Sequence, residues 1–360
     1  MSAQERLRSH PGWFSGVMGT AALAVAAFRL PDDAGVPETG FRVLGWLLLS
    51  VAILAIVAII VANAQARTSW SVIWGELRSR QRGPAYAAVP GSILMIVLAL
   101  EAGLPRISDY AAVGWILVMV TVIVAVADLL LTLVFFSSVI SNPGASQDDD
   151  VSGVWFMPQT VLLLSAAAFA RLCTTGSTPL DDFAAPLAVL FLGAGFVLFL
   201  FIGTLVLRRL VAAPLAPTSG VPTAWILMSP SAASAVAFIA LPGVTPTLLG
   251  LPPSSVTPVT TLVAGMMIGF SLWWLLVVGI LTARRGRAYL TFSPSSWSYV
   301  FPIAAVAVAS ADLAQAWSSP LLVVLAILMA ILGLVSWIVI GVVSLRWIEA
   351  RRRSEPQTSK

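Results

Sequence analysis

Few side chains in this sequence could perform acid–base, nucleophilic or metal chemistry. The chain has one histidine, His10, and one cysteine, Cys173, and neither has a second metal-ligating residue at a suitable spacing. The acidic run at 148–150 fits a solvated loop better than a cation site. Because no phosphate-binding loop or nucleophile elbow is present either, the sequence predicts neither an enzyme nor a bound cofactor or metal.

Charged residues inside apolar segments are the remaining candidates, because a charge within a bilayer is costly and usually functional. Asp128 lies well inside an apolar run. There it could hydrogen-bond between helices, pair with an arginine or relay protons. Arg29, Glu101, Arg171 and Asp312 lie nearer the ends of such runs, and we expect these four side chains to reach the membrane interface.

The composition places these residues in an all-α integral membrane protein. Of 360 residues, 59% are hydrophobic and only 10% are charged, whereas soluble domains carry about 25% charged residues. A helical crossing of the bilayer needs about 20 apolar residues, and the sequence predicts ten such spans. The predicted spans are approximately 12–30, 41–62, 85–105, 110–136, 153–172, 183–207, 222–241, 258–282, 296–316 and 320–345.

The basic residues predict the orientation, because arginine and lysine concentrate in cytoplasmic loops. With a cytoplasmic N-terminus, sixteen of the twenty basic residues fall on the inner side, although the loop 137–152 carries none. We therefore expect residues 1–10 and a basic tail, 347–360, in the cytoplasm. Residues 11–346 would form one transmembrane domain in the cell membrane. The net charge of +4 then reflects these loops and does not indicate nucleic-acid binding.

Proline recurs in or at the start of every odd-numbered span, at intervals of 79, 68, 72 and 72 residues. This period predicts five helical hairpins, each with one proline-bearing helix and one plain helix. Interior proline frees a carbonyl group and kinks the helix, so the proline helices should lie inside, where other helices or water satisfy the backbone. Five inner helices would enclose a central pore. The prolines that would shape it are Pro11, Pro90, Pro158, Pro230 and Pro302.

An uncharged pore can conduct if it is wet, and one apolar ring can close it by excluding water. Phe301, directly before Pro302, is the best-placed plug, although a purely packing role for this aromatic stays open. The other residues expected to line the pore are Phe14, Met18, Gly19 and Met157.

Three segments of the sequence resemble motifs of the tellurite-resistance/dicarboxylate transporter family. Residues 10–20 read His-Pro-Gly-Trp-Phe-Ser-Gly-Val-Met-Gly-Thr and are similar to the family's opening motif. Residues 297–302, Trp-Ser-Tyr-Val-Phe-Pro, resemble its ninth helix, and 225–230, Trp-Ile-Leu-Met-Ser-Pro, resemble its seventh. The family includes slow anion channels, malate permeases and sulfite exporters.

The resemblance implies ten helices in five hairpins with quasi-fivefold symmetry around a pore, commonly as a homotrimer. It places Phe301 at the family's gating phenylalanine. It implies small anions as substrates, such as malate and other C4-dicarboxylates, sulfite, nitrate or chloride. The sequence departs from the family at Ala21, where the motif usually has glycine. This methyl group is expected to narrow the passage.

Other function classes stay open to different degrees. A ten-span metabolite or drug exporter built from two inverted halves would repeat at about half the chain length, against the observed period near 70 residues. An intramembrane enzyme would need paired catalytic groups at one depth, which the sequence does not contain. A structural or regulatory membrane subunit is compatible with everything above.

Overall fold

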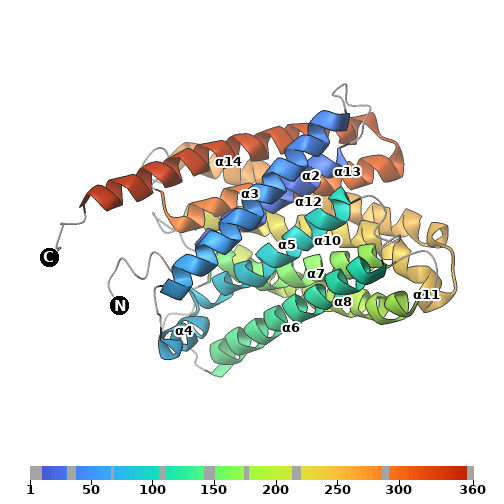
Figure 1. Ribbon diagram of the computed structural model, residues 1–360, viewed down its shortest axis with the longest axis horizontal. Helices are drawn as coiled ribbons and strands as arrows, with labels where there is room; N and C mark the ends of the chain where they lie inside the picture. Colours follow the sequence, from blue (N-terminus) through green and yellow to red (C-terminus); the bar gives the residue numbers. More distant parts are fainter. Residues whose placement is uncertain are drawn as a thin grey trace.

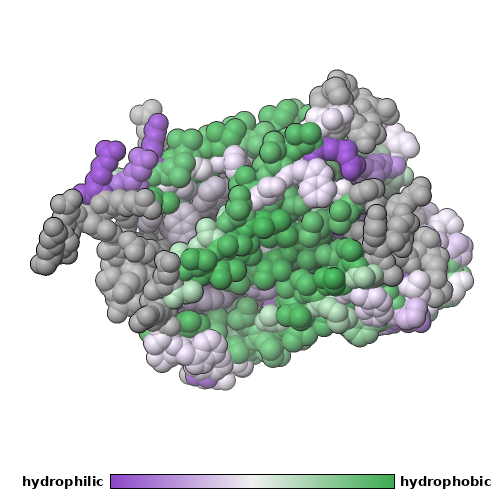
Figure 2. Space-filling view, viewed as in Figure 1, coloured by the Kyte–Doolittle hydropathy of each residue, from purple (hydrophilic) through white to green (hydrophobic). Residues whose placement is uncertain are grey.

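The computed structural model describes residues 10–30, 38–65, 69–104, 111–141, 151–173, 178–212, 220–285 and 292–354. Within these ranges all regular secondary structure is helical (Figure 1). Nine of the described helical segments are long and apolar enough to cross a membrane. Figure 2 shows apolar residues across the middle of one face and hydrophilic residues towards its two ends. These observations confirm the predicted all-helical, multi-pass membrane class.

Five helices form a closed ring, in which each contacts two neighbours and the last returns to the first. We call them the ring helices: α2 (Gly12–Arg29), α5 (Ala88–Gly103), α7 (Met157–Leu172), α10 (Met228–Ala240) and α13 (Val300–Trp317). They run in the same direction. For example, Gly12 lies against Pro294, just before α13, and Arg29 at the other end of α2 pairs with Asp312.

A second set of longer helices packs outside the ring, and each member contacts the ring helix that it follows along the chain. The outer helices are α3 (Glu38–Gln65), α6 (Ala111–Ser141), α8 (Pro179–Ala212), α12 (Thr257–Arg285) and α14 (Pro320–Ser354). The nine candidate spans divide accordingly. Those that contain ring helices are 56% to 94% buried in their most apolar windows, whereas the outer ones are 17% to 39% buried.

Helix α2 coincides with the first predicted span but is not among the nine candidate spans. Its 18 residues include glycine, serine, threonine and a terminal arginine, which lower its hydropathy. Because Phe14 to Ala27 are all buried by protein, α2 does not need the apolar surface that lipid contact would require. The prediction of ten spans, five hairpins and fivefold symmetry therefore stays a prediction.

Four of the five predicted prolines lie where a short 3₁₀ helix gives way to a ring helix, not in the middle of a bent α-helix. The 3₁₀ segments are η2 (Gly83–Ala87), η4 (Gly153–Phe156), η5 (Trp225–Leu227) and η9 (Pro294–Tyr299). Pro90, Pro158, Pro230 and Pro302 occupy the second or third position of the α-helix that follows. Proline is tolerated in a first turn, where its missing N–H has no intrahelical partner to lose. Pro11 directly precedes α2.

The start of α2 and the end of α14 adjoin each other. The rings of Trp13 and Trp347 lie 6.2 Å apart between centroids, so the described chain begins and ends on the same side of the molecule. Helix α14 continues to Ser354, eight residues past the predicted boundary at 346. Residues 1–9 and 355–360 of the predicted terminal segments lie outside the described residues, as does the acidic run at 148–150.

The remaining described elements are short and connect the longer helices at both ends of the molecule. Helix α4 follows α3 on the side where the ring helices begin. The others lie before or after α10. These short elements are α4 (Trp70–Leu77), α9 (Gly220–Ala224), η6 (Leu241–Val244), α11 (Thr245–Leu249) and η7 (Pro253–Ser255).

Candidate functional site

A cavity lies on the axis of the ring, and every ring helix contributes to its wall. Its volume of about 20 Å³ is room for about one water molecule, so an anion could pass only if the lining side chains moved. Two lining residues are charged, Glu101 and Arg171, and the rest are apolar. The apolar lining residues are Val25, Met95, Leu98, Leu164, Ala233, Val236, Phe301, Ala305 and Val308.

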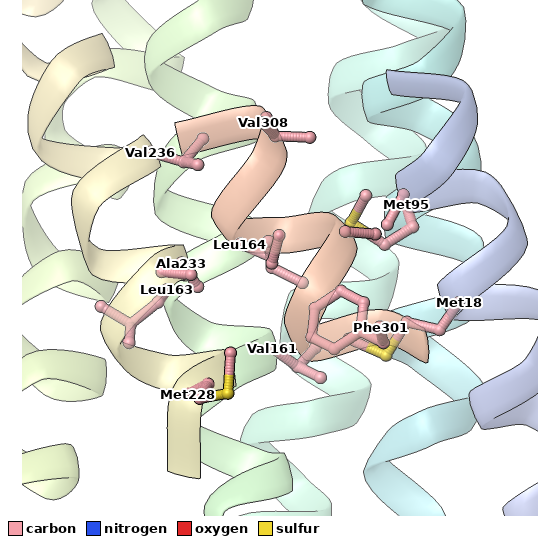
Figure 3. Packing of buried hydrophobic residues seen from close by; sticks show 14 of the residues in the cluster. Met18, Met95, Val161, Leu163, Leu164, Met228, Ala233, Val236, Phe301 and Val308 are labelled. Atoms are coloured by element: carbon pink, nitrogen blue, oxygen red, sulfur yellow. The ribbon is translucent and has the colours of Figure 1, made fainter. Parts of the chain in front are cut away.

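Phe301 lines this cavity at the end nearest the start of the ring helices. It is the second residue of α13, and its side chain is 3% exposed. Figure 3 shows its ring in the same packed cluster as Met18, Met95, Val161 and Leu164, which come from three other ring helices. The ring is therefore buried in the apolar core that the ring helices share.

Close helix packing fixes the backbone at Phe301. Gly19 of α2 lies against the first turn of α13, and a Cβ atom added there would stand 2.9 Å from Val300 Cγ1 and 3.2 Å from the Phe301 amide nitrogen. Gly16, one turn earlier, faces the Trp297 indole in the same way. The two glycines thus allow α2 and α13 to approach closely at the level of the aromatic ring.

The other predicted pore-lining residues are buried but do not belong to the wall of the cavity. Met18 is fully buried and packs at Gly91 of α5. The backbone oxygen of Phe14 accepts a 2.8 Å hydrogen bond from Ser92 Oγ. Met157, the first residue of α7, is 4% exposed. These three residues belong to the buried core cluster of the bundle, and a pore-lining role stays a prediction.

Four charged residues meet at the far end of the cavity, one from each of α2, α5, α7 and α13. We call Arg29, Glu101, Arg171 and Asp312 the charged quartet. Arg29 Nη2 lies 2.6 Å from Glu101 Oε2, and Arg29 Nε lies 3.8 Å from Asp312 Oδ1. Arg171 Nη2 donates a hydrogen bond to Asp312 Oδ2. That these side chains reach the membrane interface stays a prediction, and the structure adds that they pair with one another.

Asp128 is completely buried on α6, and neither carboxyl oxygen has a hydrogen-bond partner among the described residues. It belongs to an outer helix and does not line the cavity. Gln159 of α7, which no sequence pattern singles out, is equally buried, and its amide atoms also lack partners in the described chain. The structure brings neither residue to the ring axis.

His10 and Cys173 have structural roles at opposite ends of the ring. His10 Nδ1 accepts a 3.0 Å hydrogen bond from the Gly12 amide at the start of α2. Burial, with a contribution from Arg82, lowers the pKa of His10 to about 4. Burial, with a contribution from Asp181, raises the pKa of Cys173 to about 12. No group of three potential metal ligands occurs among the described residues.

Comparison with known proteins gives a consistent result over nearly the whole chain. A family model described as a voltage-dependent anion channel matches residues 8–345. An uncharacterized transporter of Methanocaldococcus jannaschii is 24% identical over 314 residues, which cover 83% of this chain and 82% of that protein. A second uncharacterized transporter of the same organism is 22% identical over 296 residues, or 81% of this chain and 80% of that protein.

Proposed function

The chain belongs to the voltage-dependent anion channel family, and from this premise we propose that it conducts small anions along the axis of the ring helices, with Phe301 as the gate. Membership of the family confirms the resemblance that the sequence motifs indicated. The observation that carries the proposal is the cavity, which all five ring helices line and which Phe301 lines at one end. An apolar ring on the axis of a bundle can close a pore by excluding water.

The proposed substrates are small carboxylates and inorganic anions: malate and other C4-dicarboxylates, sulfite, nitrate or chloride. Arginines support this choice, because most of them lie on the side where the ring helices begin. Arg78, Arg80 and Arg82 precede α5, and further arginines end α8, α12 and α14. Such a concentration of positive charge raises the local concentration of anions within a Debye length of about 8–10 Å.

The same arginines support the proposal that the protein lies in the cell membrane with both termini on the cytoplasmic side. We further propose the five-hairpin arrangement with quasi-fivefold symmetry, and a homotrimer, on the basis of the family. The closed ring of five parallel helices favours this arrangement over an exporter built from two inverted halves, because inverted halves would place antiparallel helices around the axis.

Substitution of Phe301 tests the proposal directly. In proteoliposomes that contain the full chain, we expect Phe301→Ala to raise nitrate, chloride or malate flux at least about tenfold, which corresponds to a barrier lower by about 1.4 kcal/mol. Phe301→Leu, which keeps most of the apolar volume, should give a smaller rise.

The matched control is Phe199→Ala. Phe199 is a buried phenylalanine of outer helix α8, 5% exposed and outside the cavity wall. Phe199→Ala removes the same buried side-chain volume as Phe301→Ala and should leave anion flux at the wild-type level. If Phe301→Ala elutes as a folded protein and its flux equals that of Phe199→Ala, Phe301 is not the gate.

A further inference from the structure

The charged quartet occupies the end of the cavity opposite Phe301. Asp312 lies eleven residues beyond Phe301 on α13, which is roughly 16 Å along a helix that rises 1.5 Å per residue. Val308, one turn before Asp312, still lines the cavity, and Arg171 and Glu101 complete its wall at that end. An ion on the axis would therefore meet Phe301 at one end and the quartet at the other.

The quartet is electrically balanced and largely removed from water. The Asp312 side chain is 4% exposed and that of Arg171 11%, against 17% for Glu101 and 21% for Arg29. Two guanidinium groups face two carboxylates, so the closed arrangement is neutral. In such surroundings a charge that loses its partner is costly, and the pairs separate only if a new partner replaces the old one.

Asp312 has a second guanidinium within reach. Arg29 Nε is buried and makes no hydrogen bond in the described chain, yet it lies 3.8 Å from Asp312 Oδ1. A movement of the carboxylate by about 1 Å towards Arg29 would bring this pair within the usual hydrogen-bond distance of about 2.7–3.2 Å. Asp312 could then leave Arg171 and keep Arg29 as its ionic partner.

We propose that the Arg171 guanidinium is an anion-binding site, and that Asp312 occupies it as an internal competitor in this closed structure. When the lining side chains move apart and admit a small carboxylate or oxyanion, this anion displaces Asp312 from Arg171, and Asp312 moves to Arg29. The quartet is thus a second closure of the path that opens by exchange of ionic partners. This inference rests on the proposed function, since it assigns the binding site and the far gate of the same pore.

The chemistry of the site predicts its preference among anions. A guanidinium group presents parallel N–H donors that match two oxygens of a carboxylate or oxyanion. Malate and nitrate can accept two such bonds, whereas chloride has no second acceptor atom. The cavity wall next to Arg171 is apolar apart from Glu101, so Arg171 is the attractive group for an anion there.

Anion-dependent thermal stability of the purified full chain in detergent measures binding without requiring transport. Malate, nitrate and chloride are the probes, with ionic strength held constant by a bulky sulfonate. A ligand that binds the folded state raises stability by RT ln(1 + [L]/Kd). We expect Asp312→Asn to tighten malate and nitrate binding at least about tenfold, because the competing carboxylate is gone, and to change chloride binding less.

Arg171→Gln alone would leave the Asp312 carboxylate with Arg29 as its one weak ionic partner, and this variant could fail to fold. The double variant Arg171→Gln/Asp312→Asn removes one positive and one negative charge together, so it abolishes the proposed binding site and keeps the quartet neutral. The double variant should fold, and malate and nitrate should no longer raise its thermal stability. The control is Arg42→Gln, an arginine at the same end of the ring that does not line the cavity. The Arg42→Gln variant should bind malate and nitrate as tightly as the wild type does.

Three results would overturn the inference: stabilisation that persists in Arg171→Gln/Asp312→Asn, binding in Asp312→Asn no tighter than in the wild type, or no stabilisation of any variant by any probe. Failure of the proposed function has a different signature. In that case Phe301→Ala would show no extra flux, while the binding pattern across the Arg171 and Asp312 variants would still hold.

Discussion

Gly19→Ala should destabilise the protein and loosen the proposed gate, because it adds one methyl group where α2 and α13 approach closely. The added Cβ would stand 2.9 Å from Val300 Cγ1, which is 0.5 Å inside the 3.4 Å at which ordinary contact begins. It would also stand 3.2 Å from the Phe301 amide nitrogen. Val300 is fully buried and β-branched, so its side chain has little freedom to rotate away.

The magnitude follows from two opposing effects. Overpacking of a well-packed core costs about 1–3 kcal/mol, whereas replacing glycine by alanine inside a helix gains about 1 kcal/mol. We expect a net destabilisation of about 1 kcal/mol. Because α13 must move away from α2 at the turn that carries Phe301, anion flux should rise, although less than in Phe301→Ala.

Thermal unfolding in detergent and flux in proteoliposomes give the two readouts. The matched control is Gly269→Ala on outer helix α12, where an added Cβ would meet nothing within 4 Å. It should be neutral or stabilising and leave flux unchanged. If Gly19→Ala matched Gly269→Ala in both measurements, the contact between α2 and α13 would not control the position of Phe301.

Two further predictions concern residues away from the cavity. Asp128→Asn should leave anion flux and its pH dependence unchanged, because Asp128 lies on outer helix α6 and not on the cavity wall; a loss of flux in folded protein would instead assign its carboxyl group to the transport path. The pKa of His10 is lowered to about 4 in the folded protein and is about 6.5 in an unfolded chain. Between these two pH values the unfolded state therefore binds more protons than the folded state. The stability of the fold should then decrease as the pH drops from about 6.5 towards 4. His10→Asn, whose amide oxygen can still accept from the Gly12 amide, should flatten this fall in melting temperature between pH 7 and pH 5, and an unchanged pH profile would remove His10 as its source.

The sequence predicted the helices better than it predicted their local geometry. Hydropathy and length identify nine of the ten predicted spans, among them the five outer helices, whose windows are only 17% to 39% buried and which must be apolar along their whole length. Helix α2 is not identified by hydropathy, since protein surrounds it on all sides and its glycines allow close packing. The 3₁₀ segments before the prolines have no reliable signature in one sequence, because the tight turn depends on what packs against it.

The charged quartet shows why tertiary pairing could not be read from the chain. Arg29 and Glu101 are 72 residues apart, and Arg171 and Asp312 are 141 residues apart. Taken singly, each of the four looks like a side chain near a span end that reaches water. Their common position near the ends of odd-numbered spans was the one available signal, and it becomes informative only once those spans are known to form a ring.

The contact between α13 and α2 has a consequence for biogenesis. The ribosome makes α2 first and α13 nearly last, and domains form from the N-terminus as synthesis proceeds. Until the final segment arrives, the small-residue face of α2 and the neighbouring face of α10 have no protein partner. The helix that completes the ring also carries Phe301 and Asp312, so both proposed closures would form in a single docking event.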